Sequence, residues 1–146
     1  MRILTVTNGY APRGQWGTEF YTQQLVGALR AEGHELAVLH PERSGERPRY
    51  EVEDAEGLDG TRVFLLHNQG SSSKRLRDSY ADEAVDRRFG EVLDEWCPDL
   101  VHFTYLLWGL SLGMPRVARE RGIATVATLT DYGLLCHRGQ MYDWRL

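Results

Sequence analysis

The segment around Gly17 and Thr18 could bind phosphate. Residues 8–16 are rich in glycine and predict a loop, and a helical pattern begins at Thr18. A loop that leads into a helix N-terminus offers unpaired backbone N–H groups and the positive end of the helix dipole. The segment contains neither the dinucleotide-binding G-x-G-x-x-G motif nor a P-loop. A plain strand-to-helix turn explains the same residues, and spacing alone favours that simpler interpretation.

Three further side chains are candidates for acid–base chemistry. Asp131 directly follows a predicted strand and is the best of them, although it could equally brace the next loop. His102 lies inside a strand pattern, where a hydrogen-bonded core histidine is at least as expected as a functional one. The same holds for His67.

Cys136 and His137 form a lone pair of potential metal ligands. No second Cys/His pair stands at the spacing of a zinc site. Cys97 and Cys136 are the two cysteines of the chain and are too few for a disulfide framework. We therefore predict neither a metal site nor a resident cofactor.

Composition restricts the classes of function. The chain has 146 residues, 42% of them hydrophobic and 26% charged, with a formal net charge of -4, which fits one globular domain that has no general attraction for nucleic acid. The apolar run at residues 3–6 is too short for a signal peptide or a membrane span, so we expect a cytoplasmic protein.

A basic cluster is the one feature that suggests a membrane surface. Acidic side chains interleave with it, so a solvated charged face is the commoner explanation, and contact with the inner face of a membrane stays an alternative. The basic residues are Lys74, Arg75, Arg77, Arg87 and Arg88.

Strand and helix patterns alternate along the chain. Strands are predicted at residues 2–7, 36–40, 62–67, 100–104 and 123–129, with a short one near 50–52, and helices at 18–32, 81–96 and 114–121. Thr18 can cap the first helix and Gly33 can end it. This order predicts an α/β, Rossmann-like parallel sheet with helices on both faces. The segments 8–19, 67–69, 104–108 and 130–140 should then share the carboxyl edge of the sheet.

Several short motifs follow one another in a specific order. They are Tyr10-Ala11-Pro12, Trp16-Gly17-Thr18-Glu19, Gly33-His34-Glu35, Pro98-Asp99-Leu100-Val101-His102, Thr128-Leu129-Thr130-Asp131-Tyr132 and Leu135-Cys136-His137-Arg138-Gly139. Each motif is weak alone, but their order and spacing resemble those of family 4 glycosyltransferases of the GT-B fold.

The resemblance implies a particular division of labour. Such enzymes have an N-terminal Rossmann-like domain that mainly binds the acceptor, and a C-terminal domain that binds the nucleotide-sugar and carries a Glu-x7-Glu motif. We find no such motif here. The resemblance therefore implies that residues 1–146 are an incomplete acceptor-side domain of a retaining hexosyltransferase, inactive in isolation. In the family the reaction usually needs no metal.

Roles are assigned to individual residues from the matching motif positions and, for Tyr105 and Trp108, from the segment 104–108 at the carboxyl edge of the sheet. The donor diphosphate loop would be Trp16, Gly17, Thr18 and Glu19. The catalytic side would hold Asp131, Thr130 and His102, and the acceptor side Tyr105, Trp108, His137 and Arg138.

This chain departs from the family pattern at several positions. Trp16 replaces a loop glycine, and its bulk could restrict the approach of phosphate. Thr130 replaces a histidine, and Thr104 stands where many relatives have a second one. A threonine can donate a hydrogen bond but cannot serve as a base near neutral pH.

The implied partners are a nucleotide-sugar donor, bound only with a C-terminal domain, and an acceptor that is a sugar, a lipid or a small metabolite. Apolar surface near the end of the chain could cause self-association. The alternatives are a stand-alone binding subunit with a separate donor-binding partner, and a non-catalytic relative. A phosphate-binding epimerase is a weaker alternative, and the missing glycine motif disfavours a nicotinamide oxidoreductase.

Overall fold

The computed structural model describes residues 1–12, 16–69 and 80–136. Its strands are β1 (Arg2–Val6), β2 (Glu35–Glu42), β3 (Val52–Glu56), β4 (Arg62–His67), β5 (Leu100–Phe103) and β6 (Ala124–Ala127). Its helices are α1 (Gly17–Ala31), α2 (Glu83–Trp96) and α3 (Met114–Glu120). The predicted basic loop lies mainly at residues 70–79, outside the described part.

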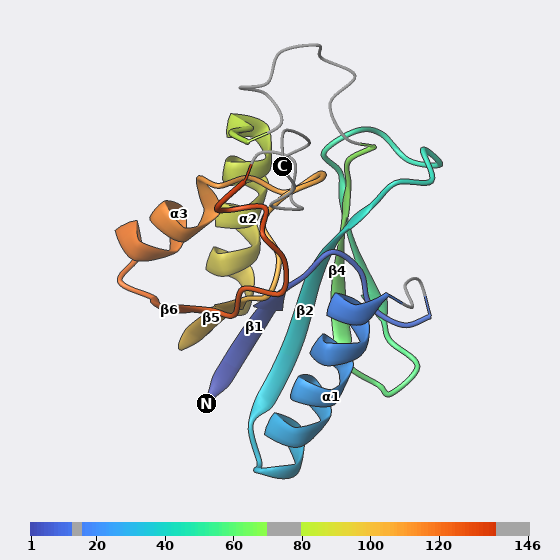
Figure 1. Cartoon of the computed structure of the whole chain (residues 1–146), viewed down its shortest axis with the longest axis vertical. Helices are drawn as coiled ribbons and strands as arrows, with labels where there is room; N and C mark the ends of the chain where they lie inside the picture. The colour runs from blue at the N-terminus through green and yellow to red at the C-terminus, as the bar shows by residue number, and fades with distance from the viewer. Residues whose placement is uncertain (13–15, 70–79, 137–146) are drawn as a thin grey trace, which may run out of the picture.

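The strands form one six-stranded sheet in the order β3-β4-β2-β1-β5-β6 (Figure 1). Neighbouring strands from β4 to β6 run parallel, and β1 lies between β2 and β5. This arrangement confirms the predicted Rossmann-like α/β fold. It also brings the carboxyl ends of the parallel strands to one edge of the sheet.

Helices cover both faces of the sheet, as predicted. Successive side chains of a strand point to opposite faces. Along β1, Ile3 packs in a cluster with Val26 of α1, whereas Leu4 packs in a second cluster with Phe89 of α2. Met114 of α3 belongs to that second cluster. In Figure 1, α2 and α3 lie together, well apart from α1.

The start of α1 differs from the expectation. The helix begins at Gly17 with Trp16 at the N-cap, so Thr18 is not the cap. Instead, a carboxylate oxygen of Glu19 accepts the Trp16 backbone N–H at 2.6 Å, in the manner of half a capping box. The end agrees with the prediction, because Gly33 follows the helix in the left-handed region at φ 85°.

Helix α2 starts two residues later than predicted because Asp82 caps it. The Asp82 carboxylate accepts the backbone N–H groups of Ala84 and Val85 at 3.0 and 3.3 Å. The predicted apolar stripe is buried, and it consists of Val85, Phe89, Val92 and Trp96.

The edge strand β3 is misplaced in the prediction and runs antiparallel to β4. A short strand was expected near residues 50–52, but Tyr50 has a φ of 68°, which no strand residue adopts. The strand therefore begins after Tyr50, at Val52. Because β3 returns alongside β4 through a short turn, it can only be antiparallel.

The opposite edge strand, β6, is four residues long, and all four are exposed. It is shorter than the predicted span of residues 123–129. It pairs with β5 in parallel, with His102 opposite Val126. No helix in the described ranges has the length and apolar character needed to cross a bilayer.

Candidate functional site

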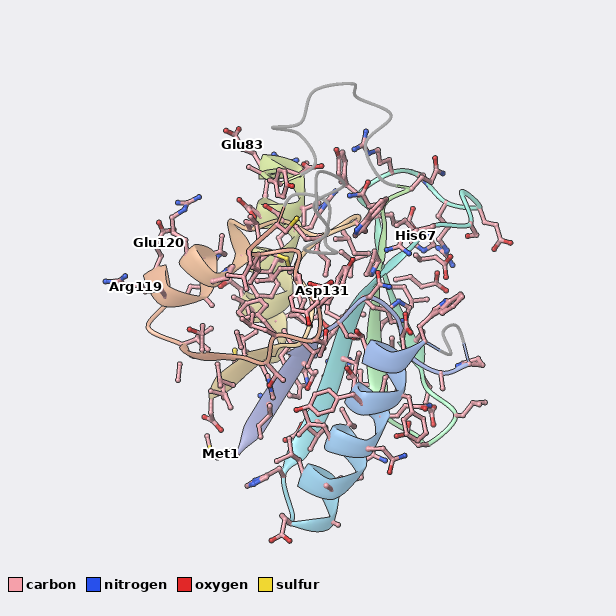
Figure 2. The ribbon with its side chains drawn as sticks, in the orientation of Figure 1. Met1, His67, Glu83, Arg119, Glu120 and Asp131 are labelled. Carbon is pink, nitrogen blue, oxygen red and sulfur yellow. The ribbon has the colours of Figure 1, made fainter. Side chains whose placement is uncertain are left out.

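The candidate site is a pocket at the carboxyl ends of β5 and β6. It is lined by residues 103–107, 127–131 and 134. Two of the four segments expected at this edge, 104–108 and 130–140, thus contribute to one pocket through their described residues. The segment at residues 8–19 lies beside it, because the Thr18 hydroxyl donates to the Thr130 hydroxyl at 3.0 Å. Figure 2 shows Asp131 near the centre of the molecule, and His67 is not among the residues that line the pocket.

Tyr105 is a half-buried hydrogen-bonding group of the pocket. Burial, with the nearby charges of Asp131 and Glu19 adding to it, raises the pKa of Tyr105 to about 12, while the charge of Arg43 opposes the rise. The phenol is therefore neutral near pH 7 and can donate a hydrogen bond to a ligand. The prediction that Tyr105 lies on the acceptor side stays a prediction, but its place in the pocket is as expected.

Asp131 lines the pocket and also braces its own loop. Its Oδ1 accepts a hydrogen bond from the Gly133 backbone N–H at 2.8 Å, so Asp131 does have the structural role of bracing its loop. A Cβ at residue 133 would come within 2.2 Å of a terminal methyl of Leu107, so the Leu107 side chain would have to shift. Within the described ranges, Oδ2 of Asp131 has no hydrogen-bond partner. This carboxylate oxygen can therefore accept a hydrogen bond from a ligand.

The Thr130 hydroxyl both accepts and donates a hydrogen bond within the protein. It accepts a hydrogen bond from Thr18 and donates one to the Thr104 carbonyl oxygen at 2.8 Å. This pair of bonds ties the loop after β6 to the first turn of α1. A ligand could take a hydrogen bond from Thr130 only if the bond to Thr104 breaks.

Further threonines continue this link into the core. The buried Thr22 hydroxyl donates to the Thr18 carbonyl oxygen at 2.8 Å. It also lies 3.1 Å from the Thr7 hydroxyl and 3.0 Å from the Thr104 hydroxyl. These contacts fix the N-terminus of α1 against the ends of β1 and β5. The side-chain hydroxyls of Thr104 and Thr18 are therefore engaged in contacts within the protein.

His102 is buried at 8% exposure and is not among the residues that line the pocket. Its Nε2 is 2.8 Å from the hydroxyl of Thr128, which does line it. Burial lowers the pKa of His102, so the ring is neutral near pH 7. Any influence of His102 on a ligand would act through Thr128.

The N-terminus of α1 keeps backbone donors available. In the described structure, the N–H groups of Gly17 and Thr18 have no partner, as expected for a first helical turn. A Cβ on Gly17 would meet nothing within 4 Å, so space is open there. The Trp16 side chain is 79% exposed. Its bulk therefore packs little against the described protein.

Sequence reasoning missed a polar connection that runs from the end of β2 to the first turn of α1. An Nη2 of Arg43 donates to the Asn8 Oδ1 at 2.6 Å, and the Asn8 amide donates to buried Glu19 at 3.1 Å. The same Arg43 nitrogen donates to the Trp108 carbonyl oxygen at 2.6 Å. Arg43 directly follows a parallel strand, so the rule that sites form at carboxyl ends could have found it.

Two predicted acceptor-side residues, His137 and Arg138, lie outside the described residues. Trp108 is described, and its side chain is 71% exposed. In the part of the chain that the structure covers, no three His, Cys, Asp or Glu side chains gather in a way that could hold a metal ion.

Comparison with protein families shows the family to which the chain belongs. A family model described as "Glycosyl transferase 4-like domain" matches residues 17–145. The chain belongs to this family. The glycosyl transferase 4-like domain therefore includes α1, both sides of the pocket and every residue named for the candidate site except Thr7, Asn8 and Trp16. No curated protein sequence gives a significant match.

The fold of this glycosyl transferase 4-like domain agrees with that of a solved structure. Sucrose-phosphate synthase from Thermosynechococcus elongatus is 16% identical, with a TM-score of 0.55 over 91% of this chain and 34% of that one. The catalytic domain of starch synthase IV from Arabidopsis thaliana is 17% identical, with a TM-score of 0.49 over 86% of this chain and 32% of that one. The chain thus spans about a third of the length of these structural relatives.

Proposed function

We propose that the natural protein transfers a hexose from a nucleotide-sugar to an acceptor hydroxyl with retention of anomeric configuration. Residues 1–146 would form its acceptor side. The proposal rests on one juxtaposition in a glycosyl transferase 4-like domain. The open N-terminus of α1 is tied through Thr18 and Thr130 to the pocket that holds Asp131 and Tyr105.

The N-terminus of α1 is the natural place for the donor diphosphate. Backbone N–H groups at Gly17 and Thr18, together with the helix dipole, favour negative charge. Charge grows on the leaving diphosphate as the glycosidic bond to it breaks. Donors that are already in place can stabilise that charge without rearrangement.

Asp131 and Tyr105 would orient the acceptor. The free Oδ2 of Asp131 can accept a hydrogen bond from a sugar hydroxyl, and the neutral Tyr105 phenol can donate one. Thr130 would hold the geometry of the site. Its hydroxyl is shared between Thr18 and the Thr104 carbonyl, so it is a positioning residue rather than a proton carrier.

The donor half would lie outside these residues, so we expect no transfer by residues 1–146 alone. The main alternative is a binding subunit that works with a separate donor-binding chain. The use of the Thr130 hydroxyl proton within the protein favours a second alternative, a non-catalytic relative. Thr130→His in the natural protein separates these cases: a strong rise in transfer indicates a weakened enzyme, and no activity in any form supports the non-catalytic relative.

Asp131→Asn tests the proposal directly. The substitution keeps the shape of the side chain and the Gly133 bond but removes the charge that a reacting hydroxyl would meet. We expect kcat for sugar transfer by the natural protein to fall by about 100-fold or more. Product formation from labelled nucleotide-sugars measures it.

Glu83→Gln provides the control for Asp131→Asn. It removes the same charge at an exposed position of α2, far from Asp131 in Figure 2, and should leave kcat unchanged. Equal rates for the two variants would rule out a role for Asp131 in the reaction.

A further inference from the structure

Arg43 holds an unusual position at the edge of the sheet. It follows β2 directly, and its Nη2 bridges Asn8 Oδ1 and the Trp108 carbonyl oxygen, each at 2.6 Å. Both acceptors are neutral. The bridge fixes the guanidinium in place without neutralising its charge.

The charge of Arg43 has no carboxylate partner within ion-pair distance in the described structure. Nor does its Nε or Nη1 have a hydrogen-bond acceptor there, although a guanidinium carries five N–H donors. Most of the other described arginines do pair with acids. These are Arg2, Arg30, Arg47, Arg49, Arg62, Arg88, Arg116 and Arg121.

Arg43 contacts a closely packed turn at Trp108 and Gly109. Trp108 and Gly109 both have positive φ values, 52° and 101°, and the Gly109 carbonyl accepts the amide of buried Asn68 at 3.0 Å. A Cβ on Gly109 would come within 3.2 Å of the Asn68 carbonyl oxygen. The turn is therefore packed tightly while the Trp108 side chain stays 71% exposed beside the Arg43 contact.

Arg43 is also close to the pocket. Its charge acts on Tyr105, which lines the pocket and also responds to the charge of Asp131. Arg43 also contacts the backbone of Trp108, which directly follows Leu107 of the pocket lining. A guanidinium edge with free N–H groups matches the paired oxygens of a phosphate or a carboxylate.

We propose that Arg43 and Trp108 form an acceptor subsite for a sugar that carries a negatively charged group. This inference rests on the proposed function. Arg43 binds the phosphate or carboxylate, and the Trp108 indole packs against the apolar face of the sugar ring. The donor diphosphate has its own place at Gly17 and Thr18, so Arg43 is free to select the acceptor.

Ligand binding to the natural full-length protein tests this subsite without requiring turnover. Hexose 6-phosphate, a hexuronate and the neutral hexose are titrated separately and followed by ligand NMR. We expect at least one charged sugar to bind about tenfold more tightly than the neutral one. Whichever charged sugar binds more tightly then identifies the preferred anionic group as phosphate or carboxylate.

Three substitutions make the test specific to Arg43. Arg43→Gln should remove the preference for the charged sugar and leave the weak binding of the neutral hexose. Arg119→Gln removes the same charge from an exposed site on α3, far from Asp131 in Figure 2, and should change nothing. Arg43→Lys keeps the charge and should retain part of the preference, which guards against a folding defect in Arg43→Gln.

Several outcomes would overturn the subsite. They are equal binding of charged and neutral sugars, no binding of any of the three sugars, and a preference that survives Arg43→Gln. Weaker binding of nucleotide-sugar to Arg43→Gln, with an unchanged acceptor preference, would assign Arg43 to the donor instead. Loss of transfer activity alone would count against the proposed function but not against this subsite.

Discussion

At the scale of single residues, the pocket combines groups that differ in how much freedom they have. Asp131 keeps one carboxylate oxygen available, and the neutral Tyr105 phenol can donate a hydrogen bond. Thr130, by contrast, is held by two hydrogen bonds, and His102 is bonded to Thr128. The side chains that can respond to a ligand are therefore Asp131 and Tyr105.

The buried His102 should make the stability of the domain depend on pH. Its pKa in the folded state lies below the ordinary value of 6.5, because burial disfavours the charged ring. Below pH 6.5 the unfolded chain takes up a proton that the folded chain resists, so the folded state loses stability as the pH falls towards the lowered pKa. Above pH 6.5 this contribution is constant.

His102→Gln should flatten this dependence while keeping a hydrogen bond to Thr128. Thermal unfolding of the wild type and the variant, measured from pH 7.5 down to about pH 5, checks it. An unchanged slope in His102→Gln would show that the ring is not held neutral.

Local sequence identified Asp131 because it follows a strand directly, and a parallel sheet collects such residues at one edge. It could not identify the role of Thr18, whose hydroxyl partner Thr130 is 112 residues away. Arg43 was missed because the polar stretch after β2 resembles any solvated loop. Its partners, Asn8 and Trp108, come from other parts of the chain.

At the scale of elements, the N-terminus of α1 connects the fold to the proposed donor site. The link of Thr18 to Thr130 and the buried contacts of Thr22 fix its position. Because the space around Gly17 is open, a side chain there would interfere with a ligand rather than with the protein.

Gly17→Val should therefore weaken donor binding without unfolding the domain. We expect KM for the nucleotide-sugar to rise by about 10- to 100-fold in the natural protein, with little change in Tm. Gly27→Ala in the same helix is the control, since its Cβ also meets nothing within 4 Å. That variant should be about 0.5–1 kcal/mol more stable and bind the donor normally. An unchanged KM in Gly17→Val would place the diphosphate elsewhere.

Buried elements were easier to predict than edge elements. The apolar stripe of α2 and the apolar runs of β1 and β4 form patterns that burial against the core requires, and such patterns can be recognised in the sequence. Strand β3 reads Val-Glu-Asp-Ala-Glu, and its charged side chains give no apolar alternation. Its start is set by the left-handed Tyr50, a backbone feature that the sequence does not announce.

At the scale of the whole molecule, the domain has a rigid central sheet and open surface at β6. All four β6 residues are exposed, and Val126 is 43% exposed. The chain also spans about a third of the length of the sucrose-phosphate synthase structure that it resembles. The described pocket at the carboxyl ends of β5 and β6 and the N-terminus of α1 lie side by side at one edge of the sheet.

The most direct measurement is turnover of labelled nucleotide-sugars by the intact natural protein and by pure residues 1–146. Both are assayed with a panel of sugar acceptors, and NMR of any product gives its anomeric configuration. We predict transfer with retention by the intact protein and none by residues 1–146. Transfer by residues 1–146 alone, or a product of inverted configuration, would contradict the account.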